Sequence, residues 1–190
     1  MMRRLVPGIA VIGLLAGCGA PPPAQETKKE DPVARGKYLV TVMACNDCHT
    51  PFKMGPKGPE PDMTRMLSGH PESNVLPAPP AMAPDAPYNW AGAATGTAFA
   101  GPWGVSYAIN LTPDANTGLG PWTEEMFVKA IRTGTHWGAA RPILPPMPWQ
   151  SVAQLTDQDL HAVWAYLHTI PAIQNHVPDS VVAGQVIPAK

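Results

Sequence analysis

Charged residues and cysteines are both scarce in this sequence. Lys, Arg, Asp and Glu together make up 14% of the 190 residues, the formal net charge is −1, and no block of like charge occurs. The chain therefore offers no basic surface for nucleic acid. With only three cysteines, it also lacks the second Cys-x-x-Cys pair that commonly completes a structural zinc site.

Proline and glycine, by contrast, are abundant. The 25 prolines and 17 glycines indicate much irregular chain, whereas a hydrophobic content of 45% is enough for a compact core. The length suits one domain, since domains commonly have about 100–150 residues. Eleven prolines fall between Thr50 and Tyr107, and no amphipathic pattern survives there. We therefore predict one domain over residues 32–190 that contains an irregular insert at 51–106.

The N-terminal residues are typical of an export signal followed by a tether. Two arginines precede an apolar run that ends in small residues, and this run is too short to span a membrane as a mature helix. The stretch LAGC at 15–18 resembles a bacterial lipobox, which predicts a lipoprotein signal peptide at 1–17 and a lipid on Cys18. An ordinary cleavable signal is the alternative. Residues 18–31 are rich in proline and charge, and we expect them to form a flexible, lipid-anchored tether. The protein would then be exported and held at a bacterial membrane, facing the periplasm or the cell exterior.

The stretch CNDCH at 45–49 places two thiols and an imidazole within five positions. A zinc site needs four ligands, and a thioredoxin-like pair needs a βαβ frame that the flanking sequence does not indicate. Covalent haem fits better. Cys45 and Cys48, one helical turn apart, can each add to a vinyl group of one porphyrin, and His49 can bind the iron. A plain disulfide between the two cysteines is the remaining alternative.

A haem iron bound by one histidine needs a ligand on its other face if the protein is to carry electrons, and methionine there raises the reduction potential. Met147 is the candidate that the sequence favours. It lies in ILPPMPWQ, which we call the strap (residues 143–150), where Pro145, Pro146 and Pro148 stiffen an extended backbone between two predicted helices. His136 is the main rival, because imidazole is also a common axial ligand.

Three helices are predicted from apolar spacing and end signals. They cover residues 33–44, 122–134 and 156–171, the second beginning after the cap Thr123 and the third after the cap Thr156. Gly36 in the first helix is interpreted either as a point of close helix approach or as a simple N-terminal cap. His161 and His168 are expected on the surface.

Several other residues have two interpretations. Arg132 and Arg141 either pair with haem propionates or are solvated. Asp114 and Asn116 suggest a calcium site, although a turn is favoured because the twelve-position EF-hand pattern is absent. The aromatic residues of the insert, which could hold it on the core or shield a haem edge, are Trp90, Phe99 and Trp103.

Taken together, these segments resemble the class I cytochrome c family, and in particular the cytochrome c domains that accompany bacterial membrane-bound dehydrogenases. The matching stretches occur in the family's order and are GKYLVTVMACNDCHT, NLTPDANTGLGPWTEEMFVKAIRTG, PPMPW and LTDQDLHAVWAYLHTIP. The resemblance implies an all-α fold with a helical shell around one covalent haem c. It implies thioether bonds at Cys45 and Cys48, with His49 as the proximal ligand and Met147 as the distal one. The long insert has no counterpart in a minimal cytochrome c.

The function implied is one-electron transfer and not enzymatic catalysis. We expect a monohaem carrier between a dehydrogenase or quinol-oxidising complex and a terminal acceptor, with redox proteins and a membrane as its partners. A haem enzyme or gas sensor with an open or labile sixth site is the alternative, and a subunit in which haem only stabilises the fold is a third possibility.

Overall fold

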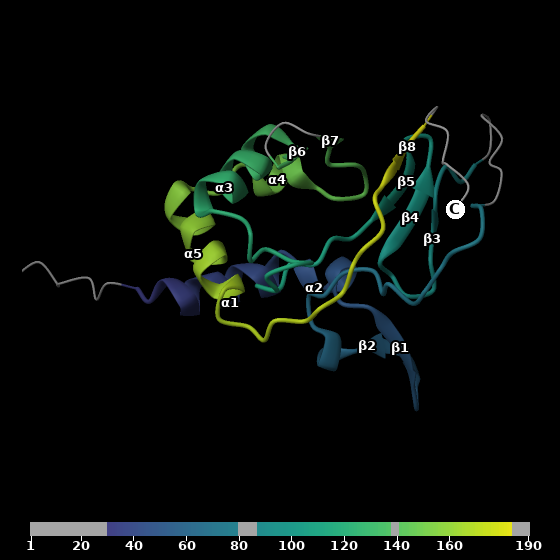
Figure 1. The fold of residues 1–190 in the computed structure, drawn as a ribbon, viewed down its shortest axis with the longest axis horizontal. Coiled ribbons are helices and arrows are strands. Elements are labelled where there is room, and N and C mark those ends of the chain that lie inside the picture. Colours follow the sequence, from purple (N-terminus) through teal and green to yellow (C-terminus); the bar gives the residue numbers. More distant parts are fainter. Residues whose placement is uncertain (1–29, 80–86, 138–140, 184–190) are drawn as a thin grey trace, which may run out of the picture.

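The computed structural model describes residues 30–79, 87–137 and 141–183. The predicted signal peptide, Cys18 and nearly all of the predicted tether lie outside these residues. The helices in the described part are α1 (Pro32–Val42), α2 (Cys45–His49), α3 (Glu124–Thr133), α4 (Trp149–Val152) and α5 (Asp157–Leu167), as shown in Figure 1. None of the described helices has both the length and the apolar character needed to cross a lipid bilayer.

The three predicted helices are present, and their ends follow from local side-chain chemistry. The Thr123 hydroxyl accepts a hydrogen bond from the backbone N–H of Met126 at the start of α3, and Gly134 ends that helix with a φ of 66°. Thr156 caps α5 in the same way. Asp31 caps α1, which begins at Pro32. Both threonine caps predicted from the sequence are therefore confirmed.

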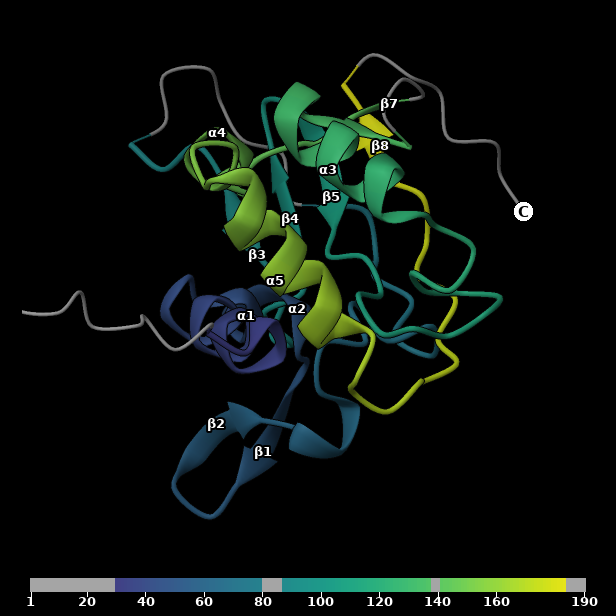
Figure 2. The same cartoon turned by 90° about the vertical axis from the view of Figure 1, so that its left-hand side faces the viewer.

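Helices α1 and α5 form the central contact of the core, and Figure 2 shows α5 crossing α1, which is seen nearly end-on. A Cβ atom on Gly36 would lie 1.9 Å from the carbonyl oxygen of Ala162, so only glycine permits this crossing. Of the two interpretations of Gly36, close helix approach is correct. The Arg35 side chain donates a hydrogen bond of 2.9 Å to Asp159 beside the crossing.

The prediction that the fold is all-α is not confirmed, because three small antiparallel sheets accompany the helices in the described part. One sheet pairs β1 (Phe52–Gly55) with β2 (Gly58–Pro61), and another pairs β6 (Thr135–His136) with β7 (Arg141–Pro142). The third has the order β3-β4-β5-β8 and is formed by Ala91–Gly92, Ala98–Gly101, Gly104–Tyr107 and Val181–Val182.

Most of this strand structure, with a short 3₁₀ turn at Met63–Arg65, lies in the insert at 51–106, where the sequence predicts only irregular chain. The strands have two to four residues each, too few for an alternating apolar pattern to be recognised. The third sheet also needs β8, which comes from the C-terminal segment. Its pairing could not be predicted from local sequence.

The segment after α5 runs back along the molecule to reach β8 (Figure 1) and is held to the insert by a buried asparagine. The side-chain amide of Asn175 donates to the carbonyl oxygens of Ser68 and His70, over 2.7 and 2.8 Å. Its side-chain oxygen accepts hydrogen bonds from Arg65 and from the backbone of Glu72. One side chain therefore connects two segments that are far apart in the sequence.

Replacing Gly36 with alanine should lower the free energy of unfolding by about 3 kcal/mol, since a backbone oxygen cannot move aside as a flexible side chain can. Gly92→Ala is the matched control. A Cβ there would meet Phe99 at an ordinary 3.5 Å, so a change within about 0.5 kcal/mol is expected. Urea unfolding of both variants measures the difference. Equal stability of the two would contradict the packing assigned to Gly36.

Candidate functional site

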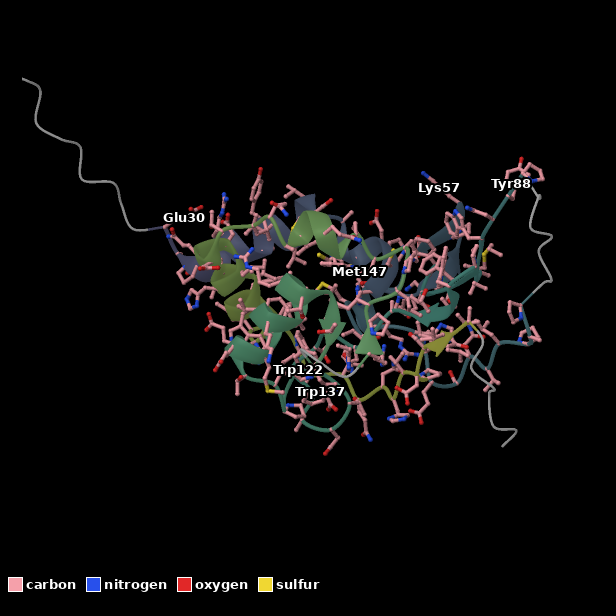
Figure 3. All side chains as sticks on the ribbon, turned by 90° about the horizontal axis from the view of Figure 1, so that it is seen from above. Glu30, Lys57, Tyr88, Trp122, Trp137 and Met147 are labelled. Atoms are coloured by element: carbon pink, nitrogen blue, oxygen red, sulfur yellow. The ribbon has the colours of Figure 1, made fainter. Side chains whose placement is uncertain are left out.

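One cavity in the described part gathers every residue predicted to bind the cofactor. Cys45, Cys48 and His49 line it from α2, and Met147 lines it from the strap. The strap lies across the interior from α2 in the view of Figure 1, and Met147 lies in the middle of the molecule in Figure 3. Apolar side chains from α1, α3 and α5 form much of the remaining wall, among them Val40, Phe127, Ala130, Ile131, Val163 and Leu167.

The attachment turn begins where the backbone leaves α1. Ala44 has a φ of 56°, which ends the first helix and starts the separate turn α2. Cys45 and Cys48 are half-buried free thiols, so the disulfide alternative is not what the structure shows. Burial raises the pKa of Cys45 to about 11 and also raises the pKa of Cys48. Thiols that act in redox exchange have lowered pKa values, so this environment does not suit a thioredoxin-like pair.

His49 is buried, and its tautomer is determined by one contact. Its Nδ1 lies 2.8 Å from the carbonyl oxygen of Ile109. A carbonyl can only accept, so Nδ1 carries the proton and Nε2 keeps its lone pair. Burial lowers the pKa of His49, which keeps the ring neutral. A neutral ring whose second nitrogen is held in this way is the usual arrangement of a metal-binding histidine.

The end of α2 is held by a further buried hydroxyl. Thr50 is fully buried and donates a hydrogen bond of 2.8 Å to the side chain of Asn46. The same hydroxyl accepts a hydrogen bond of 2.9 Å from the backbone N–H of Leu67 in the insert. The insert and the attachment turn therefore support each other directly.

Two methionines line the cavity, Met43 and Met147. Met43 lies two residues before Cys45 and therefore belongs to the same wall as the thiols. Met54 and Met63 are exposed, at 77% and 57%, and Met82 lies outside the described residues. Of the two lining methionines, Met147 is therefore the one that does not belong to the wall of the attachment turn. It comes from the strap, on the facing side of the cavity.

The rival ligand His136 also lines the cavity. Its ring meets Trp122 edge-on, with 5.2 Å between the ring centres, and Trp122 in turn stacks on Trp137. Burial, assisted by the positive charge of Arg141, lowers the pKa of His136 to about 4. The structure therefore brings both ligand candidates to one cavity.

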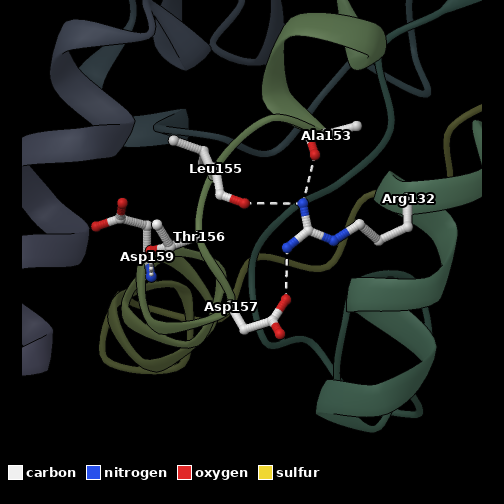
Figure 4. Close-up of polar contacts among 6 residues, drawn as sticks. All are labelled: Arg132, Ala153, Leu155, Thr156, Asp157 and Asp159. Atoms are coloured by element: carbon white, nitrogen blue, oxygen red, sulfur yellow. Dashed lines mark hydrogen bonds and ion pairs between the residues drawn. The ribbon is translucent and has the colours of Figure 1, made fainter.

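The two arginines have different roles. Arg132 donates hydrogen bonds to the carbonyl oxygens of Ala153 and Leu155 and forms an ion pair with Asp157, as Figure 4 shows. Its guanidinium is thus occupied in joining α3 to the turn before α5. Arg141 instead lines the cavity, and its nearest acidic partner, Asp179, is 3.8 Å away and almost fully exposed. Of the two, Arg141 is the one that would be available to a haem propionate in this cavity.

The calcium interpretation of Asp114 is not supported. The Asp114 carboxylate accepts hydrogen bonds from the backbone of Asn116 and from the backbone and hydroxyl of Thr117. These bonds form the predicted turn, and they lower the pKa of Asp114. In the described ranges, no three His, Cys, Asp or Glu side chains gather as candidate ligands of a metal ion.

Comparison with known proteins shows the family to which the chain belongs. The sequence model of the cytochrome c family matches residues 33–171. The chain belongs to the cytochrome c family. Membership implies covalently bound haem c, and the chain's own residues fit that group, because two thiols, an imidazole with a free Nε2 and a thioether line one apolar cavity.

The relatives include cytochrome subunits of dehydrogenases. The chain is 31% identical over 173 residues to the cytochrome c subunit of alcohol dehydrogenase (quinone) from Gluconobacter oxydans, covering 90% of this chain and 28% of that protein. It is 29% identical to the fructose dehydrogenase cytochrome subunit of Gluconobacter japonicus, over 72% of this chain and 21% of the relative. It is 35% identical to the gluconate 2-dehydrogenase cytochrome c subunit of Pantoea cypripedii, over 78% and 25%. The chain spans about a quarter of the length of these relatives.

Some residues of the cavity could not be predicted from the sequence. The carbonyl of Ile109 orients His49 but is a backbone group that no motif reveals. Ser106 and Ser180 line the cavity from the third sheet and its flank, and their positions depend on strand pairing. Phe99, predicted to hold the insert on the core or shield a haem edge, does line the cavity, with the half-exposed Trp90 ring 5.8 Å away.

Replacing Arg132 with alanine should lower the free energy of unfolding by about 1–3 kcal/mol, because two carbonyl groups and a carboxylate lose their partner. Lys129→Ala, on the same helix and exposed, is the control and should change stability by no more than about 0.5 kcal/mol. Thermal unfolding followed by circular dichroism checks both. If Arg132→Ala leaves the stability unchanged but shifts the haem spectrum, Arg132 contacts a haem propionate instead.

Proposed function

We propose that this protein is a monohaem c-type cytochrome that carries one electron at a time. The haem is attached through Cys45 and Cys48, and its iron is bound by His49 and Met147. The observation that carries this proposal is the arrangement of the cavity, in which both thiols and both proposed ligands line one largely apolar wall. When bound, the haem supplies a one-electron change between ferric and ferrous iron.

The residues of the chain account for the properties that a carrier needs. The Ile109 carbonyl holds the His49 ring in the tautomer whose Nε2 can bind. The strap brings Met147 to the same cavity, and its thioether would fill the second ligand position of a bound iron and leave none open. Buried side chains such as Trp122, Phe127 and Leu167 exclude water from the cavity. Exclusion of water disfavours the extra positive charge of ferric iron and so raises the reduction potential.

The electron donor is proposed from the relatives. Three of them are cytochrome subunits named after alcohol, fructose and gluconate dehydrogenases, which supports a dehydrogenase or a quinol-oxidising complex as donor. A terminal acceptor on the same side of the membrane would take the electron. The single CxxCH motif of this chain supports one haem.

The location is proposed from the N-terminal sequence. A lipobox at 15–18 supports attachment of lipid to Cys18, which would hold the domain at a bacterial membrane facing the periplasm or cell exterior. The segment between Cys18 and α1 would then act as a tether. Such a tether keeps an electron carrier close to membrane-bound partners while leaving it free to turn between them.

Replacing Met147 with alanine should abolish the weak absorption band of the ferric protein near the red edge of the visible spectrum, because that band requires sulfur on the iron. Met43→Ala removes the other thioether of the cavity and should keep the band. Reduced wild-type protein should bind carbon monoxide slowly, whereas reduced Met147→Ala should bind it at once. Survival of the band in Met147→Ala, together with its loss in His136→Ala, would reassign the ligand. Rapid carbon monoxide binding by the wild type would favour a gas sensor or haem enzyme.

Replacing Cys18 with serine should release the protein from the membrane fraction of cells that export it, because no acyl chain can then be attached. Fractionation followed by detection of the haem measures the distribution. Wild-type protein should sediment with membranes and dissolve only in detergent. Recovery of the wild type in the soluble exported fraction would show that the signal is an ordinary cleavable one.

A further inference from the structure

The middle of the strap has few backbone groups with which to hold its position. Pro145, Pro146 and Pro148 have no backbone N–H. The bonds at the two ends are local: the N–H of Ile143 bonds to the carbonyl of Gly134, and the N–H of Trp149 bonds to the carbonyl of Met147 itself. These bonds join the strap to its own neighbours in the chain. They do not connect it to the sheet that forms another wall of the cavity.

One hydrogen bond makes that connection. The hydroxyl of Ser106 lies 2.6 Å from the carbonyl oxygen of Pro145 and 3.3 Å from that of Phe99. Both oxygens can only accept, and a hydroxyl has one proton to donate. The shorter contact is therefore the hydrogen bond, and it ends on a residue two positions before Met147. In the described part of the chain, no other hydrogen bond links the strap to this sheet.

Ser106 is itself firmly placed. It is 7% exposed and lies in β5, which has β4 on one side and β8 on the other. Ser106 is paired with Phe99 of β4, and the preceding residue, Val105, is paired with Val181 of β8. A donor on an interior strand has little freedom to move, which is what a positioning group requires. The strap, by contrast, is irregular chain.

We propose that Ser106 is a positioning residue that holds Met147 at the depth needed to bind the haem iron. This inference rests on the proposed assignment of Met147 as the distal ligand. It also assigns a role to the end of the insert at 51–106: the third sheet acts as a fixed wall to which the ligand strap is attached. Without the hydroxyl, the strap keeps its local bonds and the sulfur becomes easier to displace.

Pro145 is an exposed residue, and its hydrogen bond to Ser106 is only partly buried, so water can replace the lost donor. Loss of the hydroxyl therefore mainly weakens the binding of the Met147 sulfur to the iron and has little effect on the stability of the fold. This difference separates a positioning role from a merely structural one. It also determines the measurement, which must report on the bond between sulfur and iron.

The test compares Ser106→Thr with Ser106→Val in the haem-loaded protein. Threonine and valine have the same shape and both suit a strand, but only threonine retains a hydroxyl. Imidazole is titrated into the ferric protein, where its nitrogen replaces the methionine sulfur on the iron and the weak red-edge band disappears. We expect Ser106→Val to bind imidazole about fivefold more tightly than the wild type, the factor that corresponds to one lost hydrogen bond. Ser106→Thr should match the wild type.

Thr169→Val is the control for replacing a hydroxyl with a methyl group away from the cavity. Thr169 is exposed, and its hydroxyl donates to the carbonyl oxygen of Tyr166 at the end of α5. The imidazole affinity of this variant should equal that of the wild type. If Ser106→Val and Ser106→Thr bind imidazole with equal affinity while the red-edge band still depends on Met147, the role of Ser106 is overturned and the assignment of Met147 stands. A band that survives in Met147→Ala would overturn the ligand assignment first, and this inference with it.

Discussion

The hydrogen bond from His49 to the carbonyl of Ile109 is the contact on which the site depends. Its two partners are 60 positions apart in the sequence, so it forms only when the attachment turn and the chain beyond the insert have come together. It leaves Nε2 as the free nitrogen and determines which way the ring faces. Were the proton on the other nitrogen, the same residues could line the same cavity and still offer no ligand.

The helices supply the frame that brings these two segments into contact. Gly36 allows α1 and α5 to cross with backbone almost touching backbone, and α2 continues from α1 after the turn at Ala44. The apolar faces of α1 and α5 then form one side of the cavity, and α3 closes another. Arg132 joins α3 to the start of α5 through carbonyl groups that would otherwise lack partners. Helix packing therefore sets the size of the space in which the cofactor is held.

The insert supports this helical frame through specific hydrogen bonds. Its hydrogen bond from Leu67 to Thr50 supports the end of the attachment turn, and its sheet reaches the ligand strap through Ser106. The C-terminal segment completes the arrangement, because Asn175 binds the insert and β8 extends its sheet. The additional chain, which a minimal cytochrome c lacks, thus contacts both faces of the proposed haem site. Because the groups that surround a metal centre influence its reduction potential, these contacts of the insert are expected to affect the potential of the haem.

The local chemistry of this protein is written in its sequence: the helix ends at Thr123 and Thr156, the paired thiols beside His49, and a methionine held between prolines. Each of these depends on residues within a few positions of one another, and so each leaves a pattern that can be read along the chain. Long-range contacts, by contrast, place Arg141 in the cavity wall and Arg132 outside it, bring Ser106 to the strap, and form a sheet within the insert. Those outcomes depend on pairings between distant segments, and short strands broken by glycine and proline carry too little local pattern to specify their partners.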